Sequence, residues 1–416
     1  MTLLCRWINY FLIGKEKNFM MNKCVPITLI TGYLGSGKTT LLNNLLRNSN
    51  NYKIAVIVND IGEVNIDAQL IEKGGIVNKK EESLVALSNG CICCTLKKDL
   101  IEQIAEIIKQ NKFDHIVIEA SGICEPIPIA QTLEFLHDNL LELFHKEVCK
   151  LDAVVSVVDA IRMAKEFGCG ETLDKDKVDE EDIENLIIQQ IEFCDILLLN
   201  KVSDVSKDDL NKVKAVIKKL QPSAKIIETD YSNVDLSEIL DTKLFDFDKA
   251  LSSAGWKQEL EKDEDDDDND HDEHDHEHHG CDHEEHHHDH EHGETEEYGI
   301  GTYVYCRRRP FDRLKFDDFC AMDFGRQIIR TKGLVYFSDN TDMAYLYEQA
   351  GTSKSLTEHG EWYAVMLTQE EIDEFLATDE LFKKDWDPEY GDRMIRLVFI
   401  GQHLDKAKIK ELLDQA

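Results

Sequence analysis

Positive charge is scarce in this sequence. Its 47 lysines and arginines stand against 83 aspartates and glutamates, which gives a net charge of −36. A chain this acidic gains no binding energy from releasing the counterions of nucleic acid or of anionic lipid. The composition therefore argues against a nucleic-acid partner and against electrostatic attachment to a membrane.

Long apolar runs are also missing. The first segment, residues 1–24, contains an apolar stretch at 7–13 that is too short to cross a bilayer, and no small-residue cleavage site follows it. We expect this segment to be a flexible N-terminal extension, with Met20 or Met21 as an alternative start. No internal repeat is visible.

Cysteine is too rare for a disulfide scaffold, with twelve in 416 residues. Three of these cysteines crowd into four positions at 91–94. That spacing suits a metal better than distant cross-links. Together with the lack of an export signal, it predicts a cytoplasmic protein.

Acidic residues are concentrated in one place. Residues 261–297 hold 20 acids, one lysine and eleven of the sixteen histidines, with no core-forming content. Such a composition predicts a disordered linker. Neutral imidazole binds zinc, cobalt and nickel, so we interpret the linker as a metal-collecting arm. A solvated acidic linker is the alternative.

Short apolar runs alternate with helical patterns in residues 25–250. Buried strands are predicted at 25–31, 53–58, 115–119, 153–158 and 196–200, and helices at 38–47, 96–109 and 210–220. This alternation predicts an α/β domain with a mostly parallel sheet covered on both faces.

A second, smaller α+β domain is predicted at 298–416. Its expected strands lie at 299–306, 333–337, 362–367 and 393–400, and its expected helices at 316–320, 370–377 and 406–413.

A phosphate-binding loop occupies residues 32–39, which match G-x-x-x-x-G-K-[ST] between a predicted strand and a predicted helix. Backbone N–H groups of such a loop surround the β-phosphate at a helix N-terminus. Lys38 would contact the β- and γ-phosphates, and the Thr39 hydroxyl would bind Mg²⁺. The predicted nucleotide-binding residues of the loop are Gly32, Gly35, Ser36, Gly37, Lys38 and Thr39.

Two further strand ends carry candidate site residues. The strand at 115–119 ends at Glu119, a catalytic candidate for positioning Mg²⁺ and the attacking water. An ordinary strand-end acid is the alternative. Gly122 would let the backbone approach the γ-phosphate.

The strand at 196–200 runs into Asn200 and Lys201, which fit the N-K-x-D turn that reads guanine. In that turn the carboxylate accepts from the N1 and N2 donors of the base. Here Ser203 holds the acid position and Asp204 follows one residue late. Either a bulge brings Asp204 into place or base selectivity is relaxed; we favour GTP over ATP.

The second chemical signature is Cys91, Cys93 and Cys94. Three thiolates favour Zn²⁺ or Cu(I) over Mg²⁺ or Ca²⁺, and they leave a tetrahedral site one ligand short, which suits a metal that must be passed on. Buried structural cysteines, an iron–sulfur site and a redox pair are the alternatives. Glu63 lies where P-loop switches sense the γ-phosphate, and is a candidate zinc ligand or a solvated loop acid.

These motifs together resemble the CobW family of metallochaperone GTPases, whose relatives include the HypB and UreG maturation GTPases. The resemblance rests on residues 32–43, 59–67, 89–94 and 119–122, and on 305–311 and 391–402 in the second domain. It implies GTP hydrolysis coupled to insertion of zinc or cobalt into a client protein. It adds Thr40 to the nucleotide-binding residues. The chain departs at 59–63, where the family usually has N-E-F-G-E.

The sequence thus predicts a GTPase that binds zinc at the three cysteines and transfers it to a client metalloprotein, with GTP and Mg²⁺ as cofactors. Co²⁺ is an alternative metal. The rival hypotheses are a zinc reservoir with a regulatory nucleotide domain, and a cobalt-insertion factor for cobalamin synthesis or a nitrile hydratase. A small-molecule P-loop kinase is a weaker rival, since it leaves the cysteines and the arm without a role.

Overall fold

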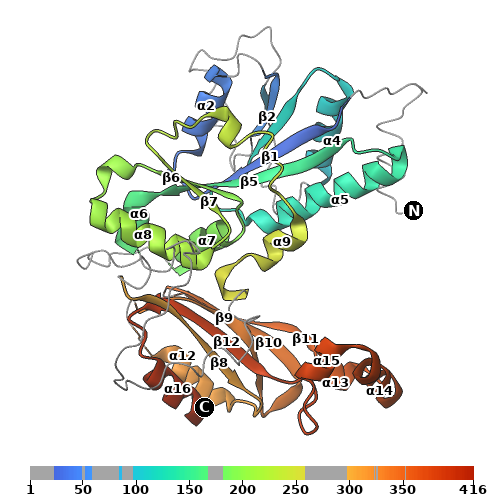
Figure 1. The fold of residues 1–416 in the computed structure, drawn as a ribbon, viewed down its shortest axis with the longest axis vertical. Helices are drawn as coiled ribbons and strands as arrows, with labels where there is room; N and C mark the ends of the chain where they lie inside the picture. Colours follow the sequence, from blue (N-terminus) through green and yellow to red (C-terminus); the bar gives the residue numbers. More distant parts are fainter. Residues whose placement is uncertain are drawn as a thin grey trace, which may run out of the picture. The chain divides into compact units, whose positions relative to one another are not determined.

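The chain divides into two compact units, Met1–Ala254 and Gly255–Ala416 (Figure 1). In this computed structural model the described residues are 23–48, 52–58, 84–86, 97–166, 181–257, 298–322, 324, 327–351 and 353–416. The predicted N-terminal extension, apart from its last two residues, and the predicted histidine-rich arm lie outside these ranges. Among the described helices, none is long and apolar enough to cross a membrane.

The first unit is built on a parallel sheet of seven described strands in the order β3-β2-β4-β1-β5-β6-β7. These strands are β1 (Val25–Thr31), β2 (Ile54–Val58), β3 (Leu84–Ala86), β4 (His115–Glu119), β5 (Cys149–Asp159), β6 (Ile196–Asn200) and β7 (Lys225–Thr229). All residues of β2, β4 and β6 are buried. A strand buried on both faces needs layers above and below it.

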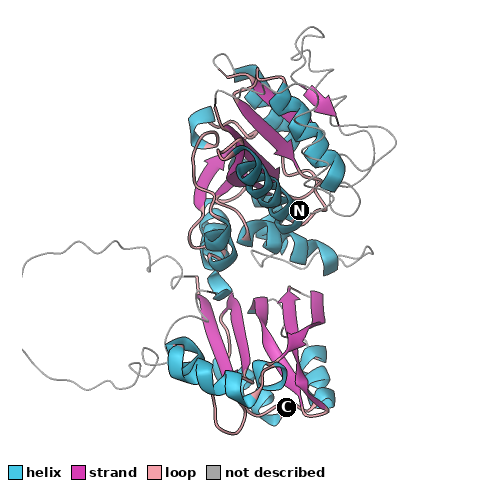
Figure 2. Cartoon of the chain, turned by 90° about the vertical axis from the view of Figure 1, so that its right-hand side faces the viewer, coloured by secondary structure: helices cyan, strands magenta, loops and turns pink. Residues whose placement is uncertain are grey.

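Helices supply these layers on both sides of the sheet (Figure 2). They are α2 (Lys38–Asn48), α4 (Lys97–Lys109), α5 (Pro126–Phe144), α6 (Ala160–Glu166), α7 (Glu181–Glu192), α8 (Lys207–Leu220) and α9 (Phe247–Ser252), with the 3-10 turns η1 (Val202–Asp204) and η2 (Leu236–Glu238). Leu41, Leu42 and Leu45 of α2 pack on one face. The predicted parallel α/β domain is therefore confirmed.

Local sequence explains where individual helices begin and end. The Ser206 side chain caps α8 by accepting from the Asp209 N–H at 3.2 Å. Acids occupy the first turn of α8 and Lys218 and Lys219 its last turn, which complements the helix dipole.

The second unit contains an antiparallel sheet of five described strands in the order β11-β10-β9-β12-β8. The elements are β8 (Ile300–Arg307), α12 (Arg313–Ala321), β9 (Ile328–Phe337), β10 (Asn340–Ala350), β11 (Ser353–Glu361), α13 (Tyr363–Met366), α14 (Gln369–Thr378), α15 (Glu380–Asp385), β12 (Ile395–Gln402) and α16 (Lys406–Gln415). Its core is rich in aromatic rings: Phe311 and Phe316 stack with centroids 4.9 Å apart. The predicted α+β domain is confirmed.

One predicted element of this unit is wrong. A strand was predicted at 362–367, but Tyr363–Met366 form the short helix α13, with Trp362 and Leu367 as its caps. The Asp392 carboxylate accepts hydrogen bonds from the N–H groups of Tyr363 and Ala364, both at 2.8 Å, and so turns the backbone into a helix. Because Asp392 is distant in the sequence, local pattern could not reveal this cap.

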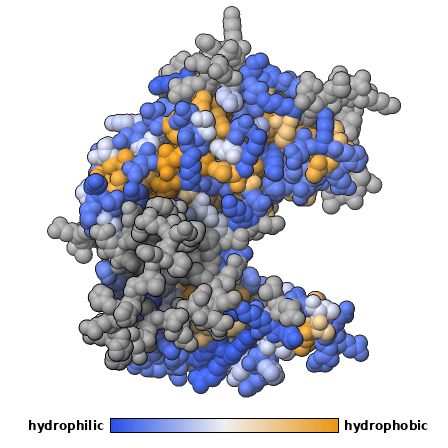
Figure 3. Space-filling model, viewed as in Figure 1, coloured by the Kyte–Doolittle hydropathy of each residue, from blue (hydrophilic) through white to orange (hydrophobic). Residues whose placement is uncertain are grey.

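Exposed apolar side chains gather at the end of the second unit that carries α13, α14 and α15 (Figure 3). Tyr363 and Met366 are each about half exposed, and Phe375 is 41% exposed. Most of the remaining surface of this unit in the same view is hydrophilic.

Candidate functional site

A cleft of about 260 Å³ opens where β1 and β4 end. Carboxyl ends of parallel strands meet at one edge of a sheet, which is where α/β proteins bind ligands. The cleft brings together the phosphate loop and the segment after β4, two parts of the chain about 80 residues apart. Its lining residues are Leu34, Gly35, Gly37, Lys38, Thr39, Thr40, Glu119, Ala120, Ser121 and Gly122.

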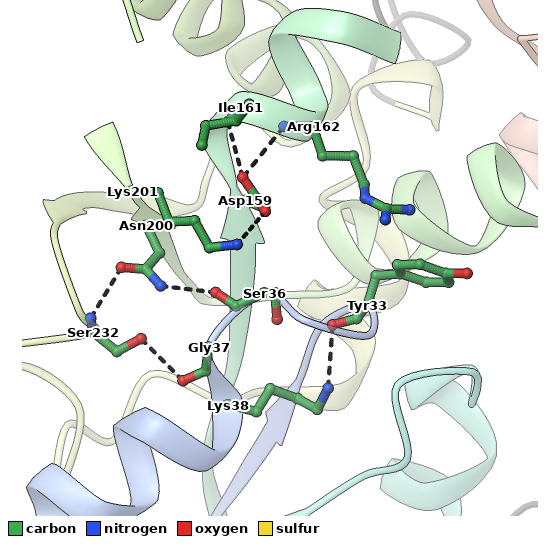
Figure 4. Close-up of polar contacts among 10 residues, drawn as sticks. All are labelled: Tyr33, Ser36, Gly37, Lys38, Asp159, Ile161, Arg162, Asn200, Lys201 and Ser232. Carbon is green, nitrogen blue, oxygen red and sulfur yellow. Dashed lines mark hydrogen bonds and ion pairs between the residues drawn. The ribbon is translucent and has the colours of Figure 1, made fainter. Parts of the chain in front are cut away.

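The phosphate loop connects β1 to the start of α2. The Lys38 ammonium donates to the carbonyl oxygen of Tyr33 at 3.2 Å (Figure 4). It also donates to the carbonyl oxygen of Gly32 at 2.7 Å. Lys38 is only 7% exposed. The loop therefore carries a positive charge beside the N-terminus of α2, which suits an anion such as a phosphate.

The segment after β4 packs closely against the phosphate loop. Glu119 is buried at the end of β4, and its backbone is in register with Ile30 of β1. A Cβ atom on Gly122 would lie 2.9 Å from the backbone nitrogen of Leu34, so only glycine fits this approach. The Gln190 amide of α7 holds the same turn by donating to the carbonyl oxygen of Cys124 at 3.2 Å.

Asn200 ties the phosphate loop to the turn after β7. Its amide donates to the carbonyl oxygen of Ser36 at 2.8 Å and accepts from the Ser232 N–H at 2.9 Å (Figure 4). The Ser232 hydroxyl donates to the carbonyl oxygen of Gly37 at 3.0 Å. Tyr231 and Ser232 adopt left-handed backbone angles with φ of 54° and 51°, which these bonds help to hold.

Lys201 pairs with Asp159 at the end of β5, with the ammonium 2.5 Å from Oδ2. The other carboxylate oxygen, Oδ1, accepts from the N–H groups of Ile161 at 2.9 Å and Arg162 at 3.2 Å (Figure 4). The Arg162 guanidinium lies over the Tyr33 ring, 4.6 Å from its centroid. This cluster fastens the start of α6 to both the phosphate loop and the turn after β6.

Asp159, Asp230 and Ser232 were not among the residues predicted from sequence. The Asp230 carboxylate accepts from both the N–H and the hydroxyl of Ser203, at 3.1 and 3.0 Å. Asp230 follows β7, a strand that was not predicted because its apolar run is only two isoleucines long, with Lys225 before it and Glu228 and Thr229 after it. Predicting that strand would have placed Asp230 at the same sheet edge as Asn200.

The predicted metal ligands Cys91, Cys93, Cys94 and Glu63 lie outside the described residues, as does the segment 59–67. In the part of the chain that the structure describes, no three histidine, cysteine or acidic side chains cluster as a metal site would require. The six cysteines within it are free thiols. Burial raises the pKa of the Cys149 and Cys194 thiols well above the ordinary value, which makes them poor metal ligands.

Two family models match this chain. The model of the CobW/HypB/UreG nucleotide-binding domain matches residues 26–228, and the model of the cobalamin synthesis protein cobW C-terminal domain matches residues 300–416. Between them they cover the cleft and the antiparallel sheet of the second unit.

Similar proteins were also found among curated sequences and solved structures. The "Zinc-regulated GTPase metalloprotein activator 1" of Dictyostelium discoideum is 36% identical over 392 residues, which are 91% of this chain and 76% of that protein. The "Zinc chaperone CobW" of Pseudomonas aeruginosa is 31% identical over 229 residues, 52% of this chain and 59% of that protein. The crystal structure of Zn(II)-bound YjiA GTPase from E. coli is 20% identical, with 94% of this chain and 99% of that chain covered and a TM-score of 0.40.

Proposed function

The chain belongs to the CobW family of P-loop GTPases, and from that premise we propose that it couples GTP hydrolysis to the delivery of zinc to a client metalloprotein. The observation that carries the proposal is the cleft in which the phosphate loop meets residues 119–122. GTP hydrolysis needs both, because one part holds the phosphates and the other orients the attacking water.

Each side of the cleft has a proposed task. Lys38 exchanges the carbonyl oxygens it now contacts for the β- and γ-phosphate oxygens of GTP. Thr39 and Glu119 line the same cleft. Their side-chain oxygens are the kind of ligand that Mg²⁺ prefers, so both residues fit this cofactor. Bound Mg²⁺ would neutralise charge that develops on the phosphates. Glu119 would also position the attacking water.

Zinc is the proposed cargo, held by Cys91, Cys93 and Cys94 with Glu63 as an additional ligand. Thiolates suit zinc, and three of them leave a position through which the ion can pass to a client. The names of the relatives from Dictyostelium and Pseudomonas support zinc over cobalt. A reducing compartment such as the cytoplasm would keep these thiols available. The histidines of residues 261–297 would collect ions for the cysteines.

The register of the strands supports a short distance between the proposed zinc site and the nucleotide. Ala86 ends β3 and pairs with Val58 of β2, which in turn pairs with Glu119. At about 4.8 Å per strand, the end of β3 lies roughly 10 Å from the end of β4. Cys91 follows Ala86 by five residues, a reach of at most about 17 Å. The cysteines can therefore approach the phosphate cleft.

Turnover and metal content together test this function. We expect the full-length chain to hydrolyse GTP and to retain zinc after purification. Lys38→Ala should lower turnover by about 10²–10³-fold because it removes a cation from the phosphates, while the three cysteines proposed to hold zinc remain in place. Cys93→Ala should lower zinc content, and deletion of residues 263–293 should lower the number of zinc ions bound.

The same measurements separate the rivals. A chain that binds zinc but does not hydrolyse GTP would be a reservoir, contrary to the proposal. Zinc content that is equal in the wild type and in Cys93→Ala would remove the cysteines from the cargo site. Zinc stoichiometry that survives the deletion would remove the histidine arm from the scheme.

A further inference from the structure

The turn after β6 lacks an acid where a guanine-reading turn needs one. Guanine presents two adjacent donors, N1–H and the N2 amino group, and one carboxylate can accept from both. In the N-K-x-D pattern that begins at Asn200, the acid position holds Ser203. A hydroxyl brings no negative charge, and charge-assisted hydrogen bonds are about twice as strong as neutral ones. The missing carboxylate must come from another position if guanine is to be read.

Three aspartates lie near this turn, and their contacts differ. Asp159 already uses both oxygens, on Lys201 and on the N–H groups that begin α6. Asp204 is exposed at the end of η1. Asp230 is half-buried, and Ser203 holds its Oδ1 by two hydrogen bonds. Among the described residues, no hydrogen bond occupies the other oxygen, Oδ2, of Asp230.

The surroundings of Asp230 fix it beside the phosphate loop. Asn200 and Thr229 are register partners at the ends of β6 and β7, so Asp230 follows β7 at the same sheet edge. Asn44 of α2 donates to the carbonyl oxygen of Tyr231 at 2.9 Å. Ser232 donates to the carbonyl oxygen of Gly37 at 3.0 Å. The turn that carries Asp230 is thus attached to the loop that would hold the phosphates.

From this geometry we infer that Asp230 supplies the carboxylate that selects guanine, and that Ser203 positions it. In this arrangement the acid comes from the turn after β7 and the hydroxyl from the turn after β6. Both oxygens of Asp230 then accept hydrogen bonds, Oδ1 from Ser203 and Oδ2 from the base. The inference rests on the proposed GTP site and names the residue that sets its base specificity.

Nucleotide selectivity tests the inference with the full-length protein, Mg²⁺ and three nucleotides: GTP, ATP and XTP. Xanthine keeps N1–H but has a carbonyl oxygen in place of the N2 amino group. The amide of Asp230→Asn can accept from N1–H and donate to that oxygen. We expect Asp230→Asn to lose at least about 10²-fold in GTP affinity and to gain XTP binding. In this variant the amide N–H would face the N2 amino group of guanine, donor against donor, and a polar group of the site left without a partner strongly disfavours a ligand.

The matched control is Asp204→Asn, which removes the neighbouring carboxylate and should leave GTP affinity within about threefold, below the tenfold effect of a single net hydrogen bond. A second pair keeps the test valid if Asp230→Asn folds poorly. Asp230→Ser should lose GTP selectivity, and adding Ser203→Asp to it should restore that selectivity. Thermal unfolding of each variant monitors the fold.

Each contrary outcome is distinct. A switch to XTP in Asp204→Asn, or unchanged GTP affinity in Asp230→Asn, would overturn the assignment of Asp230 while leaving the GTP site intact. Equal affinity of the wild type for GTP and ATP would show that the base is not read and would also overturn it. A wild type that binds neither nucleotide would instead contradict the proposed function.

Discussion

Single residues of the phosphate loop are constrained for different physical reasons. Gly35 and Gly37 both have positive φ, of 75° and 117°. A Cβ on Gly37 would lie 2.4 Å from Nδ2 of Asn200 and 2.7 Å from Oγ of Ser232. A Cβ on Gly35 would meet no atom within 4 Å. Gly35 is therefore required by backbone conformation alone, and Gly37 by conformation and by the residues packed against it.

Alanine substitutions should separate these two requirements. Gly37→Ala should be less stable than Gly35→Ala by at least about 1–3 kcal/mol, since both variants meet a positive φ but only Gly37→Ala also overlaps Asn200 and Ser232. Urea unfolding measures the difference. Equal stability of the two variants would contradict this and mean that neither the overlap with Asn200 and Ser232 nor the larger φ of Gly37 adds a cost.

A buried histidine at the start of β4, His115, makes the stability of the first unit depend on pH. Burial is the main cause that lowers the pKa of His115 to about 4, opposed by Asp152 and Asp241 and aided by Lys23. Its Nε2 lies 2.8 Å from the Thr28 hydroxyl, and its Nδ1 is buried without a hydrogen-bond partner among the described residues. Protonation would place a charge on this unpartnered nitrogen.

The sign of the effect follows from the lowered pKa. The unfolded chain binds a proton near pH 6.5 and the folded chain only near pH 4, so stability is lost as pH falls between these values. The loss is on the order of 3 kcal/mol. We therefore compare the free energy of unfolding at pH 7 and at pH 4. The wild type should lose this amount between the two pH values, and His115→Gln should not.

The pH dependence of stability must be compared between His115→Gln and the wild type, because another buried group changes stability with pH in the opposite direction. Burial raises the pKa of Asp195 to about 6, so its contribution is present at low pH and is lost as pH rises through 6. This contribution is common to both chains and cancels in their difference. Parallel pH profiles for wild type and His115→Gln would contradict the role given to His115.

The sequence predicted those strands that are buried and therefore consist of a continuous apolar run. The runs at β1, β4 and β6 are apolar and β-rich, and their bounds agree with the predicted ones. The strand β7 was missed because only two of its five residues are apolar. In the second unit β10 and β11 were missed, and β11 is mostly exposed, so it lacks an apolar pattern.

The candidate site, like the fold, could be predicted only in part from the sequence. The phosphate loop and Glu119 could be identified because each is a contiguous motif at a strand end. The bonds from Asn200 to Ser36 and from Ser203 to Asp230 join residues 164 and 27 positions apart. Such contacts depend on strand order, which local pattern does not determine.

The cap on α13 is a distant contact of this kind and can be tested by itself. Asp392→Ala leaves the N–H groups of Tyr363 and Ala364 without their acceptor. We expect a loss of about 0.5–2 kcal/mol, the range for removing a helix cap. The exposed Glu374 of α14 provides the control, since Glu374→Ala should change stability by less than about 0.5 kcal/mol. Equal effects in urea unfolding would show that Asp392 does not hold α13.

At the scale of the whole molecule, the account depends on communication between nucleotide and cargo. The phosphate cleft is built from the ends of β1 and β4, and the cysteine segment follows β3, two strands away from β4 in the same sheet. If GTP orders residues 59–67 and thereby changes the zinc affinity of the cysteines, zinc must also change the affinity for GTP. This holds because coupling between two binding sites is reciprocal.

The most direct test is a zinc titration of the full-length chain, against a competing chelator, with bound GDP and with a non-hydrolysable GTP analogue. Typical coupling between sites changes affinity by about 5–150-fold. We predict a difference in zinc affinity within this range, which disappears in Cys93→Ala. Identical zinc affinities in the two nucleotide states would contradict the account and leave hydrolysis and metal binding as separate properties of one chain.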